Sequence, residues 1–526
     1  MLTVVDLGCC ASPGKRQANS CLAFRMRAIS ARLKITGAAL AGLIYPLAFS
    51  PFDLFGLAPV ALGILFFVWR SSSPKQSAWC GFAFGMASFA VGVSWIYVSL
   101  NTFGNMPPVL AGISVAVFGA IMALYPALVG WGQATLSRSI TTWRWILFMP
   151  PLWIMGEWLR GILLGGFPWL YLGYSQVDTP LALLLPFTGT LGVGLWITLA
   201  TGLVLALFFS RSIPRVFSTI ALLFLFGLIL IAKMPRGVMP EGDPVRVAII
   251  QNNISLKDKW NPEQSSVIAN RFLQQSLALE EADLIVWPEA ALPFYRDEID
   301  PVFSNQLKQH DADYLIGLLE RERVERGSPY YNVGLGVGAE NAIYRKHQLV
   351  PFGEYLPFAS LLSWLLEYLQ IPMSDFSSGP LNQEPMDLAG TQIGVSICYE
   401  DAFTTVMNAS ALRSRVLVNL SEDAWFGDSL APHQRLQMAR ARALETGRPM
   451  IRASNSGLSA IISHDGSVDK VAPQFRAVTL RGRVQPMTGT TPFVALGNYP
   501  VILICLFLLA IGILRHHLCG RVKPEC

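Results

Sequence analysis

The chain has 526 residues, of which 52% are hydrophobic and only 14% are charged, compared with about 25% charged residues in an ordinary soluble domain. This composition excludes a disordered protein and argues against a wholly soluble one. Residues 1–240 contain 19 charged side chains with a net charge of +11, whereas residues 241–496 contain 52 with a net charge of −8. The overall charge of +5 therefore describes no single surface and gives no support to nucleic-acid binding.

The first half of the chain predicts a helical membrane domain. Residues 76–137 contain no Asp, Glu, Lys or Arg, and because one bilayer crossing needs about 20 residues, this stretch predicts two spans joined by a turn at 101–108. The same criterion predicts eight spans in all, the second and seventh short enough to be tilted or partly interfacial. They cover residues 35–51, 56–69, 79–100, 107–132, 144–164, 181–209, 216–233 and 499–514.

The positions of Lys and Arg predict how these spans are oriented. The basic clusters lie before the first span, in alternate loops and after the last span, and they include Arg32, Arg70, Arg138, Arg211 and Arg515. Since cytoplasmic loops carry the excess of Lys and Arg, both termini are predicted to be cytoplasmic. Seven spans before the acidic segment then place that segment outside the cytoplasm. Lys233 and Arg236 do not follow this pattern.

Two features of the first half have no place in this arrangement. Residues 1–25 contain three cysteines but no apolar core of a signal peptide, so we expect a disordered tail or a translation start at Met26. Glu157 and Arg160 lie three residues apart in the fifth span. Intramembrane charges are candidates for function, and a structural ion pair is the alternative. The spans contain no inverted repeat or polar stripe of the kind that indicates a transport pathway.

Residues 241–496 predict a separate α/β domain. Short buried strands are predicted at 245–250, 282–287, 314–317, 392–397 and 416–420, with helices between them such as 263–280 and 431–447. The predicted organisation is thus a tail (1–33), a membrane domain (34–240), this domain (241–496), and a last span with its tail (497–526). Cys398 is the only cysteine of the α/β domain, which excludes an internal disulfide there.

Three chemically reactive side chains follow apolar strands in this domain. Glu289 ends Leu-Ile-Val-Trp-Pro-Glu, Lys346 lies in Ile-Tyr-Arg-Lys-His-Gln, and Cys398 ends Gly-Val-Ser-Ile-Cys. The ends of strands are where sites assemble in open α/β sheets. Each residue also has an ordinary interpretation: a solvated turn carboxylate, a surface charge beside His347, and a small buried thiol.

Together these motifs resemble the nitrilase (carbon–nitrogen hydrolase) superfamily, and from about Lys34 to Arg515 the chain resembles its membrane members, the apolipoprotein N-acyltransferases. Glu, Lys and Cys stand in the same order. The resemblance extends to Phe-Pro-Trp-Leu (167–170), Tyr-Ser-Gln (174–176), Trp260, Val-Pro-Phe-Gly-Glu (350–354), Cys-Tyr-Glu (398–400), Asp-Ala-Trp-Phe-Gly (423–427) and Gln-Met-Ala-Arg (437–440). Glu422 departs from the expected Asn, which puts the hydrogen bonding beside the site in doubt.

The resemblance implies a fold, a place and a reaction. The fold is a multi-pass α-helical membrane domain plus an extracytoplasmic α/β nitrilase-like domain, an α-β-β-α sandwich. The place is the bacterial inner membrane, with the catalytic domain on the periplasmic side. In the implied reaction Cys398 takes an acyl chain from a phospholipid as a thioester. It passes the chain to the α-amine of the diacylglyceryl-modified N-terminal cysteine of an apolipoprotein, the last step of lipoprotein maturation.

Residue chemistry is consistent with these roles. A thiol with a pKa near 8.5 needs a base or a cation to attack an ester, and Glu289 supplies the base. Lys346 favours the thiolate and stabilises the oxyanion together with the backbone N–H of Tyr399. By resemblance, Glu354 supports Lys346 or moves with a loop, Tyr399 and Glu400 orient the thiol turn, and Trp260 belongs to the site.

Both predicted substrates are anchored in lipid, which requires the site to lie against the bilayer. The apolar stretch 355–369 is predicted to be a lid that dips into lipid, or alternatively a helix packed on the core. No cofactor is implied, and the scattered His residues show no metal-ligand spacing. Two other functions stay open at this point: a membrane-tethered amidase or nitrilase-type hydrolase, and a transporter with an extracytoplasmic binding domain.

Overall fold

A computed structural model describes residues 30–137, 143–210, 215–232, 237–323, 325, 328–355 and 375–521, with side chains to residue 518. The predictions for the first 25 residues, including the start at Met26, lie outside the described residues. The predicted lid at 355–369 also lies outside them, apart from Tyr355.

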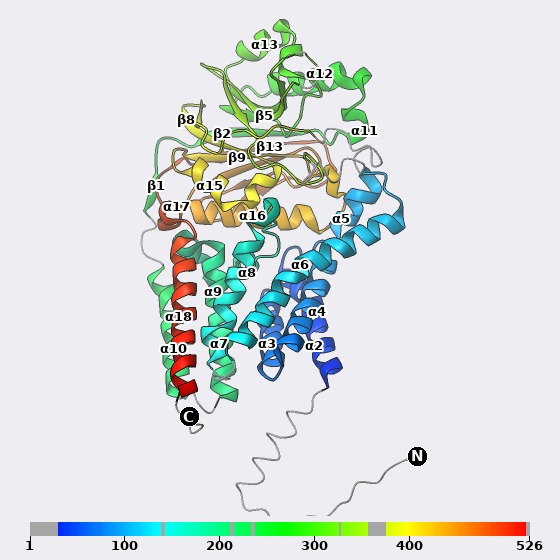
Figure 1. Cartoon of the computed structure of the whole chain (residues 1–526). Coiled ribbons are helices and arrows are strands. Elements are labelled where there is room, and N and C mark those ends of the chain that lie inside the picture. Colours follow the sequence, from blue (N-terminus) through cyan, green and yellow to red (C-terminus); the bar gives the residue numbers. More distant parts are fainter. Residues whose placement is uncertain are drawn as a thin grey trace, which may run out of the picture.

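The chain forms a helical bundle below and a layered α/β domain above it in Figure 1. Each of the eight predicted spans coincides with one or two helices of the bundle. These are α2 (Ala31–Ile44), α3 (Leu57–Arg70), α4 (Pro74–Gly92), α5 (Trp95–Val98), α6 (Pro108–Leu136), α7 (Arg144–Leu147), α8 (Met149–Arg160), α9 (Leu185–Phe209), α10 (Arg215–Ile231) and α18 (Tyr499–Arg521).

The helices differ in their ability to cross a bilayer. By length and composition, three described segments suffice: α6, the 180–209 segment that ends in α9, and α18; the pair formed by α4 and 95–103, bent by 53°, would be a fourth. The remaining helices are shorter, such as α3 with 14 residues and α10 with 17. The total of eight spans therefore stays a prediction.

Small residues allow the bundle helices to approach closely. Gly81 of α4 faces the backbone of α6, where a Cβ atom would stand 2.1 Å from the carbonyl oxygen of Pro126. Any side chain at this position would separate the two helices. Close backbone approach is a common way for helices to associate in lipid, where the hydrophobic effect between helices is absent.

The upper domain is built on two six-stranded sheets, and the predicted strands and helices are found there. The first sheet has the strand order β13-β2-β3-β4-β5-β6 and the second β12-β11-β10-β9-β8-β7. The first comprises β2 (Val245–Gln251), β3 (Leu284–Val286), β4 (Asp313–Arg321), β5 (Tyr330–Val337), β6 (Ala342–Arg345) and β13 (Val478–Val484). The second comprises β7 (Met386–Leu388), β8 (Thr391–Ile397), β9 (Val416–Ser421), β10 (Met450–Ser454), β11 (Ala460–Ile462) and β12 (Val468–Val471).

The sheets pack face to face and helices cover both outer faces, which is the predicted α-β-β-α sandwich. Val247, Leu284, Val395 and Val418 belong to the buried cluster between the sheets. Helix α12 (Ser265–Leu277) and helix α13 (Pro301–Lys308) cover the first sheet. Helices α15 (Thr404–Ala411) and α16 (Leu430–Thr446) cover the second.

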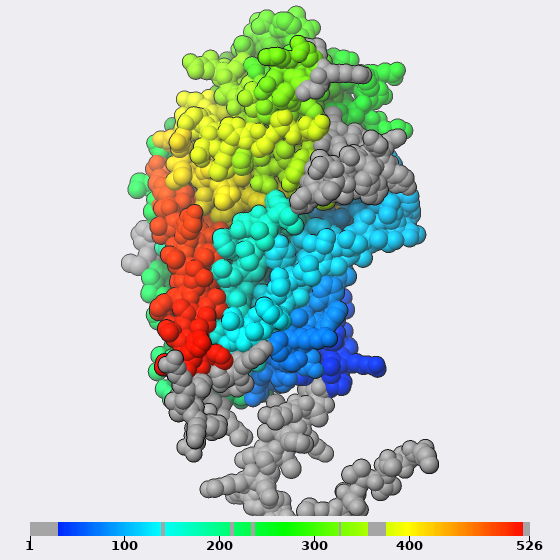
Figure 2. Space-filling model, viewed as in Figure 1, coloured from blue at the N-terminus to red at the C-terminus, as the bar shows by residue number. Residues whose placement is uncertain are grey.

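Helix α16 is the layer between the sandwich and the bundle, as Figure 1 shows. One side packs on the sheet through Ala439 and Ala443. The other joins the core of the bundle through Ala431, Met438 and Ala441. Figure 2 shows the two parts as one continuous body, with α18 forming a flank of the bundle. The outer face of the second sheet is therefore held above the bundle by α16.

Candidate active site

Cys398 lies on a sharp turn at the end of β8, where the short helix η9 (Cys398–Ala402) begins. Its φ of 52° is in the left-handed region, which a residue with a Cβ rarely adopts. Asn419 of the neighbouring strand β9 holds the turn, because its Nδ2 donates to the carbonyl oxygen of Cys398 at 3.1 Å. Strained backbone of this kind clusters at functional sites, where the surroundings enforce it.

Lys346 follows β6 and is buried, with only 1% of its side chain exposed. Its Nζ lies 2.7 Å from Oε1 of Glu354 and 3.5 Å from Oε1 of Glu289. Burial by itself would lower the pKa of Lys346, but the negative charges of Glu354 and Glu289 outweigh it and raise the pKa above its ordinary value. The predicted support of Lys346 by Glu354 is thus matched by a direct contact, and the side chain stays an ammonium.

Glu289 follows β3 and is also buried. Its Oε1 accepts a hydrogen bond of 2.7 Å from Nδ2 of Asn332 on β5. Within the described part of the chain, Oε2 is buried without a hydrogen-bond partner. Since buried carboxylate oxygens are nearly always paired, an unpaired one calls for an explanation. Here it leaves one oxygen available for a proton.

The thiol of Cys398 is neutral in this environment. Burial and the nearby charge of Glu289 raise its pKa to about 12, although Arg435 and Lys346 act in the opposite direction. A thiol with that pKa is protonated at neutral pH, so it needs a base before it can attack a carbon atom. The three predicted residues Glu289, Lys346 and Cys398 therefore lie together as a carboxylate, an ammonium and a thiol; we call them the triad.

Glu400 connects two of the turns that carry the triad. Its Oε2 accepts from the backbone N–H of Ile397 at 2.6 Å and from the hydroxyl of Tyr344 at 2.9 Å. Its Oε1 accepts from the backbone N–H groups of His347 and Gln348 at 2.7 and 2.9 Å. One buried carboxylate thus connects the Cys398 turn to the Lys346 turn through hydrogen bonds.

These turns rest on the loop that follows α8 of the bundle. The hydroxyl of Tyr399 donates to the carbonyl oxygen of Gly166 at 3.1 Å, and Nε2 of Gln348 donates to that of Gly165 at 2.9 Å. The ring of Tyr399 stacks on Trp169, with centroids 6.3 Å apart. The reactive thiol is therefore adjacent to the upper end of the bundle.

Glu157 and Arg160 do not form the ion pair that their spacing suggested: no salt bridge joins them among the placed side chains. Instead each binds the loop after α8. Oε1 of Glu157 accepts from the backbone N–H of Leu172 at 3.0 Å and from Trp153 at 3.1 Å, and Arg160 donates to the carbonyl oxygen of Phe167 at 2.9 Å. The two charges thus fix the loop that supports the Cys398 turn.

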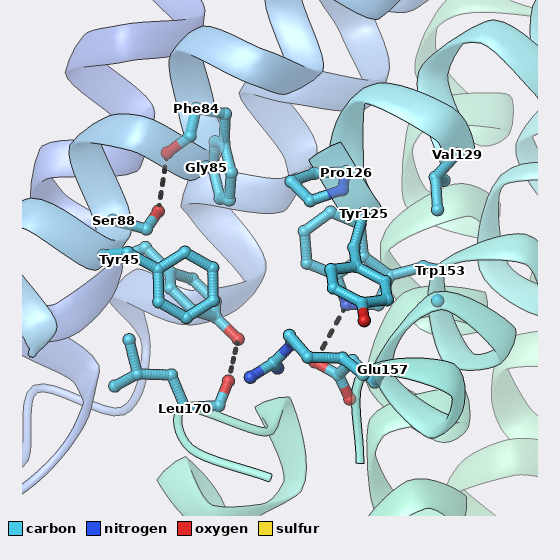
Figure 3. Close-up of a pocket in the computed structure, with 13 residues that line it drawn as sticks. Tyr45, Phe84, Gly85, Ser88, Tyr125, Pro126, Val129, Trp153, Glu157 and Leu170 are labelled. Atoms are coloured by element: carbon cyan, nitrogen blue, oxygen red, sulfur yellow. Dashed lines mark hydrogen bonds between the residues drawn. The ribbon is translucent and has the colours of Figure 1, made fainter. Parts of the chain in front are cut away.

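Both residues also line a cavity of about 40 Å³ between α4, α6 and α8, shown in Figure 3. Its other walls include Tyr45, Phe84 and Tyr125. A cavity of this size has room for a few water molecules and not for an acyl chain. It lies within the bundle, so we assign it no part in the site.

Trp260 and Glu422 are placed differently with respect to the triad. Trp260 ends the short helix α11 (Leu256–Lys259), and no described contact joins it to the triad. The preceding residue does make contacts. Nζ of Lys259 donates to the carbonyl oxygen of Glu289 at 3.2 Å and forms a buried salt bridge with Glu422. Asn455 completes the group by donating to Oε2 of Glu422 at 3.1 Å. Glu422, the departure from the expected Asn, is therefore paired.

Four residues whose side chains contact the triad were not identified from the sequence: Asn332, Asn419, Lys259 and Arg435. Nη1 of Arg435, on α16, lies 3.6 Å from Sγ of Cys398. A polar residue inside the apolar strand 330–337 was a usable signal for Asn332. Lys259 and Arg435 resemble ordinary helix charges, and only their burial, at 1% exposure each, distinguishes them. Among the described residues, no group of His, Cys, Asp and Glu has the arrangement of a metal site.

Comparison with known proteins agrees with both halves of the chain. The family model for the apolipoprotein N-acyltransferase N-terminal domain matches residues 41–203, and the carbon-nitrogen hydrolase model matches residues 246–492. The matched segments coincide with the helical bundle and with the sandwich.

Whole-length relatives extend this agreement. The chain is 39% identical to the apolipoprotein N-acyltransferase of Methylococcus capsulatus, over 90% of this chain and 94% of that protein. It is 40% identical to that of Nitrosomonas europaea, over 88% and 93% of the two chains. It is 38% identical to that of Pseudomonas putida, over 92% and 96%. The chain therefore belongs to the apolipoprotein N-acyltransferase family and carries its catalytic domain on a carbon–nitrogen hydrolase sandwich.

Proposed function

We propose that this protein transfers an acyl chain from a phospholipid to the α-amino group of the diacylglyceryl-modified N-terminal cysteine of apolipoproteins, through a thioester on Cys398. The observation that carries the proposal is the triad itself: a partly buried thiol beside a carboxylate oxygen without a partner and a buried ammonium, on turns that rest on the bundle. Membership of the family supports the same reaction.

In the first half-reaction Oε2 of Glu289 accepts the proton of the Cys398 thiol, and the sulfur attacks the ester carbonyl carbon of the phospholipid. The tetrahedral oxyanion is stabilised by the ammonium of Lys346 and by the backbone N–H of Tyr399. The C–O bond to the glycerol then breaks, and Glu289 returns the proton to the departing alkoxide. The products are a lysophospholipid and the acyl thioester of Cys398.

In the second half-reaction the α-amine of the acceptor attacks the thioester carbonyl. Glu289 removes a proton from the attacking nitrogen, and the C–S bond breaks with release of the Cys398 thiolate. The thiolate recovers the proton from Glu289, and the product is an amide. The same three side chains serve both steps, because each step requires one proton transfer and one oxyanion.

The bundle keeps the site at the lipid surface. Leu503, Phe507 and Leu514 of α18 are each more than 60% exposed, and such an apolar outer face suits contact with lipid tails. Removing an acyl chain from the bilayer costs about 0.8 kcal/mol per CH₂ group, so both substrates stay anchored while they react. We place the sandwich on the periplasmic side of the inner membrane and both termini in the cytoplasm, as the distribution of Lys and Arg predicts.

The acyl-enzyme is tested by measuring intact mass. The purified protein is incubated with phospholipid alone, and we expect a mass increase of one acyl group that hydroxylamine removes. Cys398→Ala is the matched control and should gain nothing. An unchanged mass of the wild-type protein would contradict the thioester route.

Transfer is distinguished from hydrolysis by adding a diacylated lipopeptide. We expect a triacylated product, whereas release of free fatty acid alone would indicate a hydrolase with water as the acceptor. Cys398→Ser, which preserves the size of the side chain, should be inserted normally and should lose the product. Full function of this variant would instead indicate a domain that only binds its ligand.

A further inference from the structure

Arg435 is the second buried cation beside the reactive sulfur, after Lys346. It lies within α16, and only 1% of its surface is exposed. Its Nη1 donates to Sγ of Cys398 at 3.6 Å, and also to Oγ of Ser421 and Oδ1 of Asp423 at 2.6 Å. Its Nη2 lies 3.2 Å from Oδ2 of Asp401. The guanidinium is thus fixed on several sides, with one N–H directed at the sulfur.

The charges around Arg435 form a closed cluster. Arg452 of β10 contacts the same two carboxylates, Asp401 and Asp423, each at 2.8 Å. All four side chains are buried, and their formal charges cancel. An arginine keeps its proton in such a cluster because its pKa is above 12. Among the described contacts, Arg452 hydrogen-bonds to Asp401, Asn419, Ser421 and Asp423 and not to the sulfur. Of the two arginines, Arg435 is therefore the one that contacts the thiol.

We propose that Arg435 is a further catalytic residue, which stabilises the Cys398 thiolate when Glu289 removes the proton and when the thiolate leaves the tetrahedral intermediate. The inference rests on the proposed function, because it takes Cys398 as the nucleophile. No further bond is made: the proton passes from Sγ to Oε2 of Glu289, and Arg435 remains charged throughout. A charged N–H donor beside an anion is the stronger kind of hydrogen bond.

In this assignment the two cations, Lys346 and Arg435, stabilise different charges: the substrate oxyanion and the thiolate. Lys346 is held by Glu354 and Glu289, and in the proposed mechanism it stabilises the substrate oxyanion. Arg435 has no contact with Glu354 or Glu289 among the described salt bridges, and its Nη1, which also donates to Ser421 and Asp423, lies 3.6 Å from the sulfur. The charged groups that act on the thiol from all sides are Glu289, Arg435, Lys346 and Glu354; Asp401 and Asp423 act on it through Arg435.

The test is the alkylation of Cys398 by iodoacetamide in the full-length protein, without phospholipid. The rate follows the thiolate fraction. We expect Arg435→Gln to reduce the rate at pH 8 about tenfold or more, which corresponds to a rise of one unit or more in the thiol pKa. Label that persists in Cys398→Ala is subtracted. Arg435→Lys should restore part of the rate because it retains a charge.

Arg452→Gln is the matched control, since it removes an equally buried arginine from the same two carboxylates. A merely structural role of Arg435 would give equal effects in both variants. If Arg435→Gln does not fold, Arg435→Gln with Asp401→Asn keeps the cluster neutral and is measured instead. An unchanged alkylation rate in the folded variant, or an equal loss in Arg452→Gln, would overturn the proposal.

The acyl-enzyme assay separates this inference from the proposed function. If the wild-type protein forms no thioester from phospholipid, the proposed function fails, whatever the alkylation shows. If the wild-type protein forms the thioester and Arg435→Gln forms it at the same rate, the role of Arg435 alone is wrong. We expect the rate of thioester formation to fall in parallel with that of alkylation.

Discussion

At the scale of single residues, the pKa of the Cys398 thiol depends on the balance between two carboxylates, Glu289 and Glu354, and two cations, Arg435 and Lys346. Burial and Glu289 raise the pKa of the thiol to about 12, and Arg435 and Lys346 lower it. The resting thiol is therefore neutral at pH 7 and loses its proton only as pH rises. Glu289 has two opposite effects: its charge disfavours the thiolate, yet in the proposed mechanism its unpaired oxygen accepts the proton of the thiol.

Glu289→Gln separates these two effects. Because the substitution removes the negative charge, the thiol pKa falls, and we expect faster alkylation of Cys398 at pH 8 than in the wild-type protein. Acyl transfer should be lost, since glutamine cannot accept the proton. The measurements are the pH dependence of iodoacetamide labelling and the yield of triacylated lipopeptide. Slower labelling, or retained transfer, would contradict this role of Glu289.

The buried pair Lys259–Glu422 supports the backbone of Glu289, and its loss should affect stability. Glu422→Gln leaves a buried ammonium without its counter-charge, which typically costs 3–5 kcal/mol. We expect a lower unfolding temperature in detergent, and a smaller decrease in the double variant Lys259→Met, Glu422→Gln, where no charge remains unpaired. Equal unfolding temperatures for wild type and Glu422→Gln would show that the pair is not needed.

At the scale of elements, α16 joins the sandwich to the bundle at a break in α9. Gly189 of α9 has a φ of 64° and a ψ of −175°, a conformation that only glycine adopts readily. The next residue, Thr190, donates its backbone N–H to Oε1 of Glu445 on α16 at 2.7 Å. The break in α9 thus leaves the backbone N–H of Thr190 available to donate to Glu445 of α16.

Gly189→Ala tests this junction. A Cβ atom at Gly189 would stand 2.1 Å from the ring of Phe493, and the backbone conformation itself would cost about 1–3 kcal/mol. We expect a clear fall in unfolding temperature in detergent. Gly227→Ala on α10 is the control, because a Cβ atom there meets nothing within 4 Å. A similar effect of both substitutions would indicate a general cost of altering membrane helices rather than one of the junction.

At the scale of the whole molecule, the sandwich depends on the bundle for the burial of one face. Tyr399, Phe403, Val406, Met438 and Leu444 belong to the same buried cluster as the bundle helices. We therefore expect a fragment of residues 241–496 to expose this face and to associate in the absence of detergent. Size-exclusion chromatography measures this directly, and a monodisperse monomeric fragment would contradict the expectation.

The sequence by itself predicted the class of fold, and the resemblance of its motifs to those of the carbon–nitrogen hydrolases predicted the three side chains of the triad. Periodicity and charge distribution separate a membrane part from an α/β part, and Glu289, Lys346 and Cys398 each stand at the end of an apolar strand. Hydropathy, charge and the end of an apolar strand are properties of short stretches of the chain, so neighbouring residues are enough to predict them. The same local reading failed for Glu157 and Arg160, whose spacing suggested a pair although each binds a loop.

Only the tertiary structure decided which groups surround the sulfur. Arg435 is 37 residues from Cys398 in the chain and 3.6 Å from it in space, and Lys259 is 163 residues from its partner Glu422. The Arg435 contact arises because the sheet of β8, β9 and β10 packs on α16. The Lys259 contact arises because α11 lies beside the end of β9. The residues around an arginine in a helix do not indicate which group its buried side chain will contact. That contact depends on how elements distant in sequence pack together.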